Sequence, residues 1–312
     1  MSKEKVTFAG FPACPDLNQI QADIVVIGVP FGVPYSNNSP PHCIHAPESI
    51  RRESVRFPKD LYAWDFDLGT SLSSYDDVTI VDCGNVDGKQ GDSKGNQERA
   101  HQAIKMILDA GAVPVVLGGD DSIPIPVLRA YEGGASFHVL QFDAHIDWCD
   151  EVGGIRDGYS STMRRASELP WVEKIIQVGM RGVGSARERE YRDCLAYGAE
   201  LTTARDIAKN GIEIVKKYLP KKVNCFITLD FDVLDPSIMP AVGAPTPGGL
   251  NYMELVDLIQ WVAENTHVVG ACLVEFAPEK DLNNLGAVTA MRVAWNIIGC
   301  LARSMSHKNS YK

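Results

Sequence analysis

The chain alternates continuous apolar runs with segments of helical periodicity. The runs are rich in Val, Ile, Leu and Phe and cover residues 23–30, 78–84, 112–117, 137–142, 174–179, 223–229 and 268–274. Continuous runs, unlike strictly alternating ones, are typical of strands buried on both faces of a parallel sheet. Each run is therefore predicted to be a buried strand.

Helical spacing separates most of these runs. In 95–111, Ala100, Ile104 and Ile107 share one face, and Gly111 ends the segment. Further helices are predicted over 47–52, 125–131, 186–195, 212–219, 252–264 and 287–304. Residues 1–22 are an irregular lead-in, while 31–46 and 150–161 are long loops. The alternation predicts an α/β fold with a mainly parallel sheet covered on both faces. With no flexible linker in the sequence, we expect one domain spanning residues 1–312.

Charge and cysteine usage narrow the functional classes. The formal net charge is -10, and basic residues gather only at 163–165 and 216–222, which disfavours nucleic acid as a partner. The eight cysteines are scattered without any Cys-x-x-Cys pair, as in reduced cytosolic proteins. The N-terminus lacks the apolar core of a signal peptide, and no run is long enough to predict a membrane span. We expect a cytoplasmic protein without membrane contact.

Acidic and histidine side chains follow four of the predicted strands. In open α/β sheets, ligands bind beyond the carboxyl ends of the strands, so these side chains are expected to share one cleft. A single acidic turn is usually a solvated turn or a helix cap, but four at one edge favour a binding site. The residues are Asp120 and Asp121, then Asp143, His145 and Asp147, then Asp230, Asp232 and Asp235, and finally Glu275.

Spacing separates candidate ligands from turn residues. Asp143, His145 and Asp147 are two apart and point to the same side of an extended segment. The stretch from Asp230 fails as a calcium loop, because its sixth residue is Asp235 and its twelfth is Ala241. Asp230 and Asp232 are therefore expected at the strand end as ligands, and Asp235, before Pro236, as a turn or cap.

The donor set predicts the metal. Oxygen ligands with one imidazole suit Mn²⁺ better than a metal that prefers thiolates. The carboxylates are too many for one ion, so two ions bridged by Asp143 and Asp230 would share them and activate water for attack on an electrophilic carbon. Glu275, outside that shell, would hold a cationic group, and a planar guanidinium fits a carboxylate through two hydrogen bonds.

These motifs resemble the ureohydrolase family, which includes arginase and agmatinase, and the details are closer to agmatinase. The resemblance implies a three-layer α/β/α fold and two Mn²⁺ ions per subunit, with Ni²⁺ as another option. It also implies hydrolysis of an agmatine-like guanidino compound to urea and an amine, by a homotrimer or homohexamer. The matching stretches are Gly118–Asp120, Asp143–Asp147, Asp230–Pro236, Gly243–Leu250 and Glu275.

Site roles follow from the resemblance, position by position. One metal would be held by Asp121, Asp143, Asp147 and Asp230, and the other by Asp143, His145, Asp230 and Asp232. Glu275 would hold the guanidinium, and Asp232 and Glu275 are the expected catalytic residues.

The chain departs from the family pattern at two positions. Asp121 stands where the family has His, and no His occurs in 157–166, where Tyr159 is nearest to the family's proton-transfer His. Five carboxylates would leave two dications one unit negative, which favours hard Mn²⁺ and raises the pKa of bound water. Tyr159 is a poor base near neutral pH, since the usual tyrosine pKa is about 10.

The departures leave alternatives open. The chain could be a catalytically weakened subunit of a hetero-oligomer with a paralogue, or it could hydrolyse a related amidine or formimino C–N bond.

Other candidate residues are expected to be structural. His42 and His45 could approach the cleft, but a surface position is favoured for both. His138 is predicted in the core, Arg164-Arg165 in ion pairs, and Trp148 either in the core or lining the pocket.

Overall fold

The strands form one sheet in which all paired neighbours are parallel. The computed structural model describes residues 6–36, 42–56, 61–184 and 186–309, so 1–5 of the predicted lead-in and 37–41 of the predicted loop lie outside it. Every predicted strand is present. The strands are β1 (Ile24–Val29), β2 (Ile80–Asn85), β3 (Val113–Gly118), β4 (Phe137–Phe142), β5 (Val172–Val178), β6 (Glu200–Thr202), β7 (Asn224–Asp230) and β8 (His267–Val274).

The predicted helices are present, but the short helix over 162–166 was not predicted, and the segments near the β6 edge differ from the prediction. The predicted helix 212–219 is shorter in the structure, and β6 and α6 were not predicted, because both are short and carry few apolar residues. The helices are α1 (Ala46–Ser54), α2 (Ser93–Asp109), α3 (Pro124–Arg129), α4 (Thr162–Ala166), α5 (Glu188–Tyr197), α6 (Ala204–Asn210), α7 (Glu213–Lys216), α8 (Tyr252–Asn265) and α9 (Leu285–Asn309).

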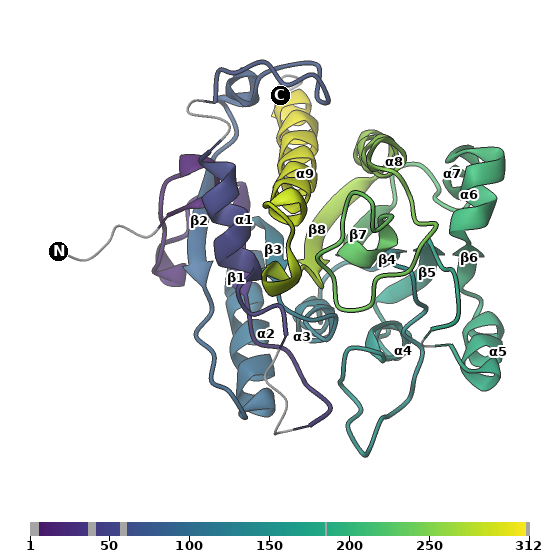
Figure 1. The fold of residues 1–312 in the computed structure, drawn as a ribbon. Coiled ribbons are helices and arrows are strands. Elements are labelled where there is room, and N and C mark those ends of the chain that lie inside the picture. Colours follow the sequence, from purple (N-terminus) through teal and green to yellow (C-terminus); the bar gives the residue numbers. More distant parts are fainter. Residues whose placement is uncertain (1–5, 37–41, 57–60, 185, 310–312) are drawn as a thin grey trace.

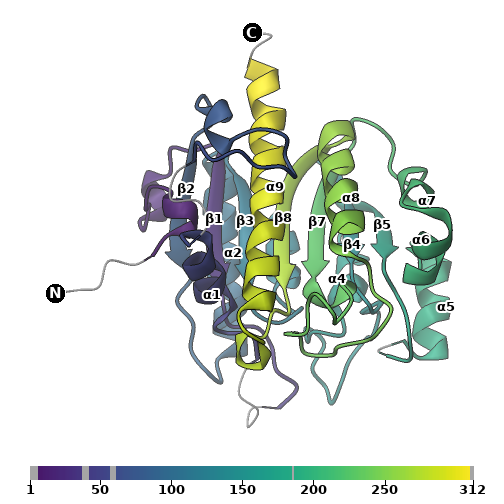
Figure 2. The same ribbon diagram turned by 45° about the horizontal axis from the view of Figure 1, so that its top comes forward.

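Each face of the sheet has its own apolar core, which gives three layers (Figures 1 and 2). On β1, Ile24 and Val26 point into the core formed with α1, α8 and α9, whereas Val25 and Ile27 point into the core formed with α2 and α3. This alternation follows from the two-residue period of a strand. The predicted three-layer α/β/α architecture is confirmed.

The strand order brings the predicted site segments together. Across the sheet the order is β2-β1-β3-β8-β7-β4-β5-β6. The four strands that precede Asp121, Glu275, Asp230 and Asp143 are thus consecutive neighbours, although they are far apart in the sequence. Their parallel direction places all four carboxyl ends on one edge.

Helix α9 is a core element. Its segment Leu285–Ser306 is long and apolar enough to cross a membrane, but 83% of the apolar window is buried inside the protein. The helix packs against α1 and α8 over the sheet. All eight cysteines lie in described residues, and each is a free thiol.

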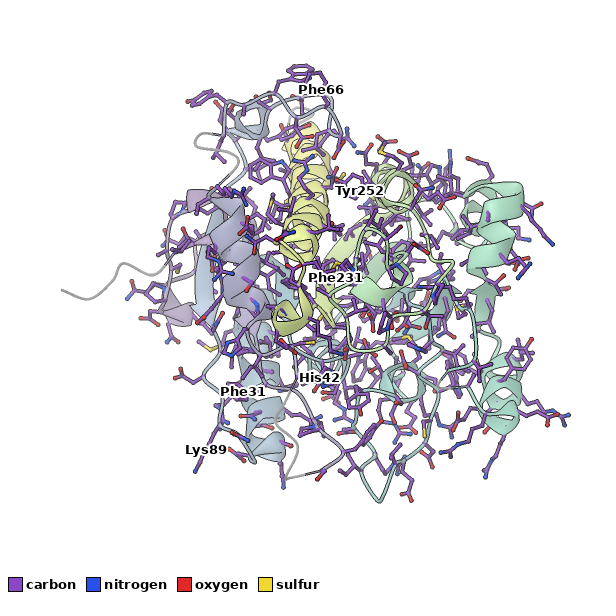
Figure 3. All side chains as sticks on the ribbon, viewed as in Figure 1. Phe31, His42, Phe66, Lys89, Phe231 and Tyr252 are labelled. Atoms are coloured by element: carbon purple, nitrogen blue, oxygen red, sulfur yellow. The ribbon has the colours of Figure 1, made fainter. Side chains whose placement is uncertain are left out.

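A loop before β2 is anchored to α9 through charge. Asp65 and Asp67 both accept hydrogen bonds from the Arg292 guanidinium, with Nη1 to Asp65 Oδ2 at 2.7 Å. Tyr252 donates its hydroxyl to Asp67 Oδ2 at 2.7 Å. Phe66, between the two anchors, is 91% exposed at the outer side of the loop (Figure 3).

Candidate metal centre

The predicted ligands converge beyond the carboxyl ends of the four central strands. Ligand atoms of Asp143, His145 and Asp232 lie within 4.8 Å of one another, as do those of Asp121, Asp143 and Asp230. Asp143 belongs to both groups. The two groups are therefore joined at one carboxylate, as a pair of neighbouring ions would require.

The β4 end is shaped by hydrogen bonds to the ligand side chains. The backbone N–H of His145 donates to Asp143 Oδ1 at 2.6 Å, and His145 Nδ1 lies 3.3 Å from that oxygen and 3.1 Å from Asp232 Oδ2. Asp147 adopts a φ of 45°, in the left-handed region that non-glycine residues rarely occupy. Such backbone conformations cluster at functional sites, where they direct a side chain.

The β7 end is fixed in a similar way. The N–H of Asp232 donates to Asp230 Oδ1 at 2.7 Å, and the N–H of Ala144 donates to Asp232 Oδ1 at 3.0 Å. Arg181 donates through Nη2 to the carbonyl oxygens of Asp232 and Thr246, both at 2.6 Å. Arg181 therefore joins the β7 turn to the loop that borders the pocket.

The cluster carries more buried negative charge than the protein neutralises. Asp121, Asp143, Asp147, Asp230 and Asp232 each expose 4% or less of their surface. Within the described residues, no Lys or Arg forms an ion pair with any of them. Isolated buried charges are costly, so this donor set fits divalent cations.

The pKa values show the same imbalance. Burial, followed by the charge of neighbouring carboxylates, raises the pKa of Asp121, Asp143 and Asp230 well above the ordinary value. Burial lowers the pKa of His145, but hydrogen bonding and the charge of Asp232 outweigh it and raise that pKa to about 9. Asp121 Oδ2 is buried and has no hydrogen-bond partner. A cation would satisfy that oxygen and offset the repulsion.

Asp120, beside Asp121, has a turn role. Its Oδ1 accepts the N–H of Ser122 at 3.0 Å. A Cβ on Gly32 would lie 1.9 Å from the same oxygen, so only glycine fits against this turn.

Glu275 lies at the end of β8, next to the cluster. Its Oε1 accepts the N–H of Asp121 at 2.8 Å, and its own N–H donates to the Gly119 carbonyl at 2.8 Å. Its φ is 67°, again in the left-handed region. The carboxylate is thus held between the end of β3 and the pocket.

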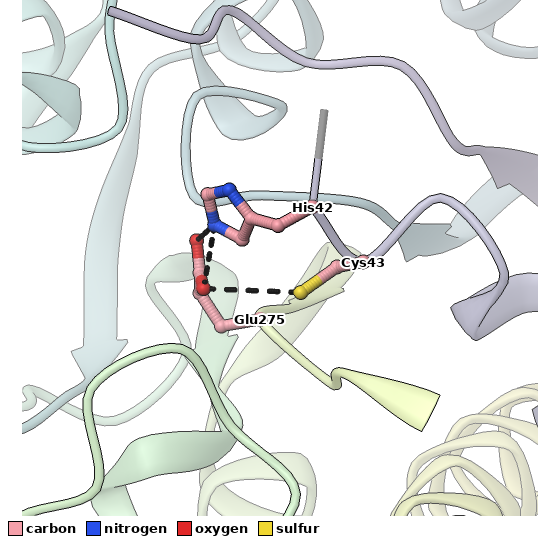
Figure 4. Close-up of side chains that lie close together, drawn as sticks. All are labelled: His42, Cys43 and Glu275. Atoms are coloured by element: carbon pink, nitrogen blue, oxygen red, sulfur yellow. Dashed lines mark hydrogen bonds and ion pairs between the residues drawn. The ribbon is translucent and has the colours of Figure 1, made fainter. Parts of the chain in front are cut away.

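His42 contacts Glu275 directly and lines the cleft, so of the two positions considered for His42 the favoured surface position is wrong. Its Nε2 lies 2.9 Å from Oε1 and 3.0 Å from Oε2 of Glu275, as Figure 4 shows. The contact joins two residues that are 233 positions apart in the sequence. Nothing in the local sequence indicates this long-range contact. His45, in contrast, is exposed as predicted.

A cavity of about 620 Å³ opens above the cluster and is of a size that suits small molecules. Tyr159 lines it, with its ring centroid 5.2 Å from that of His42 and 4.4 Å from that of Tyr35. Lys280 and Glu279 lie farther along the wall. The cavity therefore joins acidic ligands, an imidazole and an aromatic ring.

The remaining predicted residues are structural. Asp235 accepts the N–H groups of Ser237 at 3.0 Å and Gly248 at 2.8 Å, and these hydrogen bonds lower its pKa to about 2. Trp148 is 1% exposed, which decides between the two predictions in favour of the core. His138 is buried in β4, while Arg164 and Arg165 pair with Glu168, as predicted.

Sequence reasoning missed two buried glutamines behind the cluster. Gln141 Nε2 donates to Asp143 Oδ2 at 2.7 Å and to Asp147 Oδ2 at 2.9 Å. Gln177 Nε2 donates to the Ile146 carbonyl at 2.8 Å. The available signal was a glutamine inside each of two apolar strands, because a buried amide needs hydrogen-bond partners.

The chain is similar to known proteins in sequence and in fold. The family model described as Arginase family matches residues 22–300. Agmatinase from Pyrococcus horikoshii is 26% identical over 291 residues, covering 93% of this chain and 95% of that protein. N(1)-aminopropylagmatine ureohydrolase from Thermus thermophilus is 35% identical over 212 residues, covering 66% of this chain and 69% of that protein. The structure of proclavaminate amidino hydrolase from Streptomyces clavuligerus superposes with a TM-score of 0.82 at 23% identity, covering 96% of this chain and 98% of the other.

Proposed function

Because the chain belongs to the arginase family, we propose that it hydrolyses a small, agmatine-like guanidino compound to urea and an amine. The observation that carries the proposal is the buried cluster of five carboxylates and one imidazole, with Glu275 beside it. Agmatinase and N(1)-aminopropylagmatine ureohydrolase among the relatives support a guanidino substrate.

We propose Mn²⁺ as the native metal, with Ni²⁺ as a substitute. The family is one of binuclear metal hydrolases, and the described residues contain two candidate ligand groups that share Asp143. When bound, two such ions supply positive charge and an activated water for attack at the guanidino carbon. Asp121, Asp143, Asp147 and Asp230 would hold one ion, and Asp143, His145, Asp230 and Asp232 the other.

Glu275 and Asp232 are the side chains proposed to act on the reactants. The Glu275 carboxylate faces the cavity and would accept hydrogen bonds from the guanidinium. Asp232, which also lines the cavity, would accept a hydrogen bond from the attacking water and orient it. Gln141 behind them keeps Asp143 and Asp147 in place.

The family is generally oligomeric, and we propose a homotrimer or homohexamer working in the cytoplasm, where free thiols persist. A catalytically weakened subunit paired with a paralogue is less well supported, because all six ligand side chains are present and converge. The loop between β7 and α8 borders the pocket, as does His42 just before α1, and these segments would select the substrate.

The test is urea release from a panel of guanidines by protein loaded with Mn²⁺ or Ni²⁺. We expect about two metal ions per chain, turnover of at least one guanidine of the panel, and a raised KM in Glu275→Gln. Formimino and amidine compounds join the panel, and release of an amine and a simple amide from one of them, with no urea from any guanidine, would indicate that related activity instead. Metal-loaded protein that releases neither urea nor such an amide would contradict the proposal.

A further inference from the structure

Hydrolysis of a guanidine needs an acid as well as an activated water. When the C–N bond breaks, its electron pair stays on the departing nitrogen. An alkyl amide ion is a very poor leaving group, so this nitrogen must take up a proton as the bond breaks. General acids in this role typically contribute about 10²- to 10⁴-fold.

Few groups in the cavity are available to donate that proton. The aspartates and His145 belong to the proposed metal cluster, and Glu275 is committed to the guanidinium. Lys280 Nζ is turned to the carbonyl oxygens of Val242 and Gly243, at 3.2 and 3.0 Å. Burial raises the pKa of Tyr159 above its ordinary value, which makes it a weaker acid. His42 is the remaining imidazole in the cavity lining.

The geometry places His42 next to the proposed guanidinium site. Its Nε2 lies between the two oxygens of Glu275, at 2.9 and 3.0 Å (Figure 4). An ionised carboxylate offers about four lone-pair sites, so Glu275 can accept hydrogen bonds from a guanidinium and from His42 at the same time. Two groups that donate to the same carboxylate lie next to each other, as the two nitrogens of a bidentate guanidinium do. His42 Nε2 would therefore lie next to a nitrogen of the bound guanidinium.

His42 is also held in place by its surroundings. The next residue, Cys43, is buried, has a φ of 62°, and brings its Sγ to 3.9 Å from Glu275 Oε2. The Tyr159 ring packs edge-on against the imidazole. Glu275 and Tyr159 therefore contact the imidazole from two different segments, as proton transfer at a defined atom requires.

We propose that His42 is the general acid that protonates the departing amine, an inference that rests on the proposed function. Water adds its OH to the guanidino carbon and releases a proton. His42 Nε2 gives its proton to the departing nitrogen, which keeps the electron pair of the broken C–N bond. The C–OH proton is lost as the urea carbonyl forms, and a proton returns to His42.

The protonation state of His42 agrees with this role. Burial lowers its pKa, but the hydrogen bond and charge of Glu275 outweigh burial and raise that pKa to about 9. The imidazole therefore carries a transferable proton at neutral pH.

The experiment compares leaving groups in His42→Ala, His42→Gln and the wild type. The substrates are N-alkylguanidines, whose departing amines need a proton, and N-(4-nitrophenyl)guanidine, whose departing nitroaniline is a better leaving group and depends less on that proton. We expect kcat for the alkyl substrates to fall about 10²- to 10⁴-fold in both variants, and for the nitrophenyl substrate less than about 10-fold. The Gln variant keeps an N–H donor to Glu275, so its KM should stay near that of the wild type. Added imidazole should partly restore kcat in His42→Ala.

His45→Ala, an exposed histidine three positions away, is the matched control and should behave as the wild type. Metal content and guanidinium affinity, measured by calorimetry, should be unchanged in His42→Gln. Equal losses of kcat for alkyl and nitrophenyl substrates would overturn the assignment and leave His42 with a positioning role. A wild type that releases urea from no guanidine would overturn the proposed function first, and the assignment with it.

Discussion

Gln141 on β4 and Gln177 on β5 lie opposite each other in the sheet, and the side-chain amide of Gln177 donates to Gln141 Oε1. This contact directs the Gln141 amide nitrogen toward Asp143 and Asp147. Both glutamines are at most 1% exposed. The sheet interior therefore contains a supporting layer of hydrogen bonds directly behind the carboxylates.

Replacing Gln141 with Leu should weaken metal binding about 10- to 100-fold, because hydrogen-bonded neighbours of ligands keep them oriented. The volume changes little, so the fold should be retained. Competition with a coloured chelator measures the affinity. Gln102→Leu, on the exposed side of α2, is the control. Unchanged affinity in Gln141→Leu would show that Asp143 and Asp147 hold their positions without the amide.

Metal loading should stabilise the protein, and more so at higher pH. In the metal-free protein the pKa values of Asp121, Asp143 and Asp230 are raised. These groups destabilise the folded state above their unfolded pKa of about 3.9, and this cost is relieved as the pH falls and they take up protons. Metal replaces those protons. At 100 times Kd one ion adds about 2.7 kcal/mol.

Thermal unfolding with and without Mn²⁺, from pH 5 to 8, tests this expectation. The difference in Tm should widen as the pH rises. Asp143→Asn should raise the Tm of the metal-free protein, because it removes one of the buried negative charges. A Tm difference that narrows with rising pH would contradict the repulsion argument.

Asp121→His should shift metal preference toward softer ions. The change removes one carboxylate and adds an imidazole, which Ni²⁺, Cu²⁺ and Zn²⁺ bind more readily than Mn²⁺ does. Affinity ratios for Ni²⁺ over Mn²⁺, measured in wild type and variant, give the result directly. We expect the ratio to rise at least about tenfold, equivalent to about 1.4 kcal/mol. An unchanged ratio would mean that residue 121 does not contact the metal.

Arg292→Met should lower stability at neutral pH and matter less in acid. Burial alone would raise the pKa of Asp65 and Asp67, but their hydrogen bonds, including those from Arg292, outweigh it and lower both. Groups with lowered pKa stabilise above the unfolded value of about 3.9, and that stability is lost as the pH falls through the folded values.

We expect Arg292→Met to lose about 1–3 kcal/mol at pH 7, measured by urea unfolding, with a smaller loss near pH 3. Arg303→Met, which breaks the outer pair with Glu264, should cost no more than about 1 kcal/mol. A loss in Arg292→Met that is constant with pH would indicate lost packing in place of lost charge pairing.

The sequence predicted the features that depend on local pattern. Buried parallel strands are recognised in a sequence as continuous apolar runs. Because their carboxyl ends share one edge of the sheet, the convergence of Asp143 and Asp230 could be predicted. The His42 contact did not follow, because it joins side chains that are 233 positions apart and no local pattern indicates it. Gln141 and Gln177 were missed because one polar residue in an apolar strand is compatible with many environments.

The short elements at the border of the sheet, β6 and α6, could not be predicted from the apolar pattern of the sequence either. β6 has three residues, and α6 carries Ala204 and Ile207 as its buried side chains. Neither shows a full period of apolar residues. Their structure is imposed by packing against β5 and α7, which a single sequence does not reveal.

Strands β3 and β4 follow each other along the chain, yet β8 and β7 separate them in the sheet. A polypeptide that ends before β7 lacks both strands that lie between Asp121 and Asp143 in the sheet. We therefore expect the metal centre to form only after β7 and β8 have been synthesised. A truncation before β7 should abolish metal binding, although most of the ligand residues would still be present.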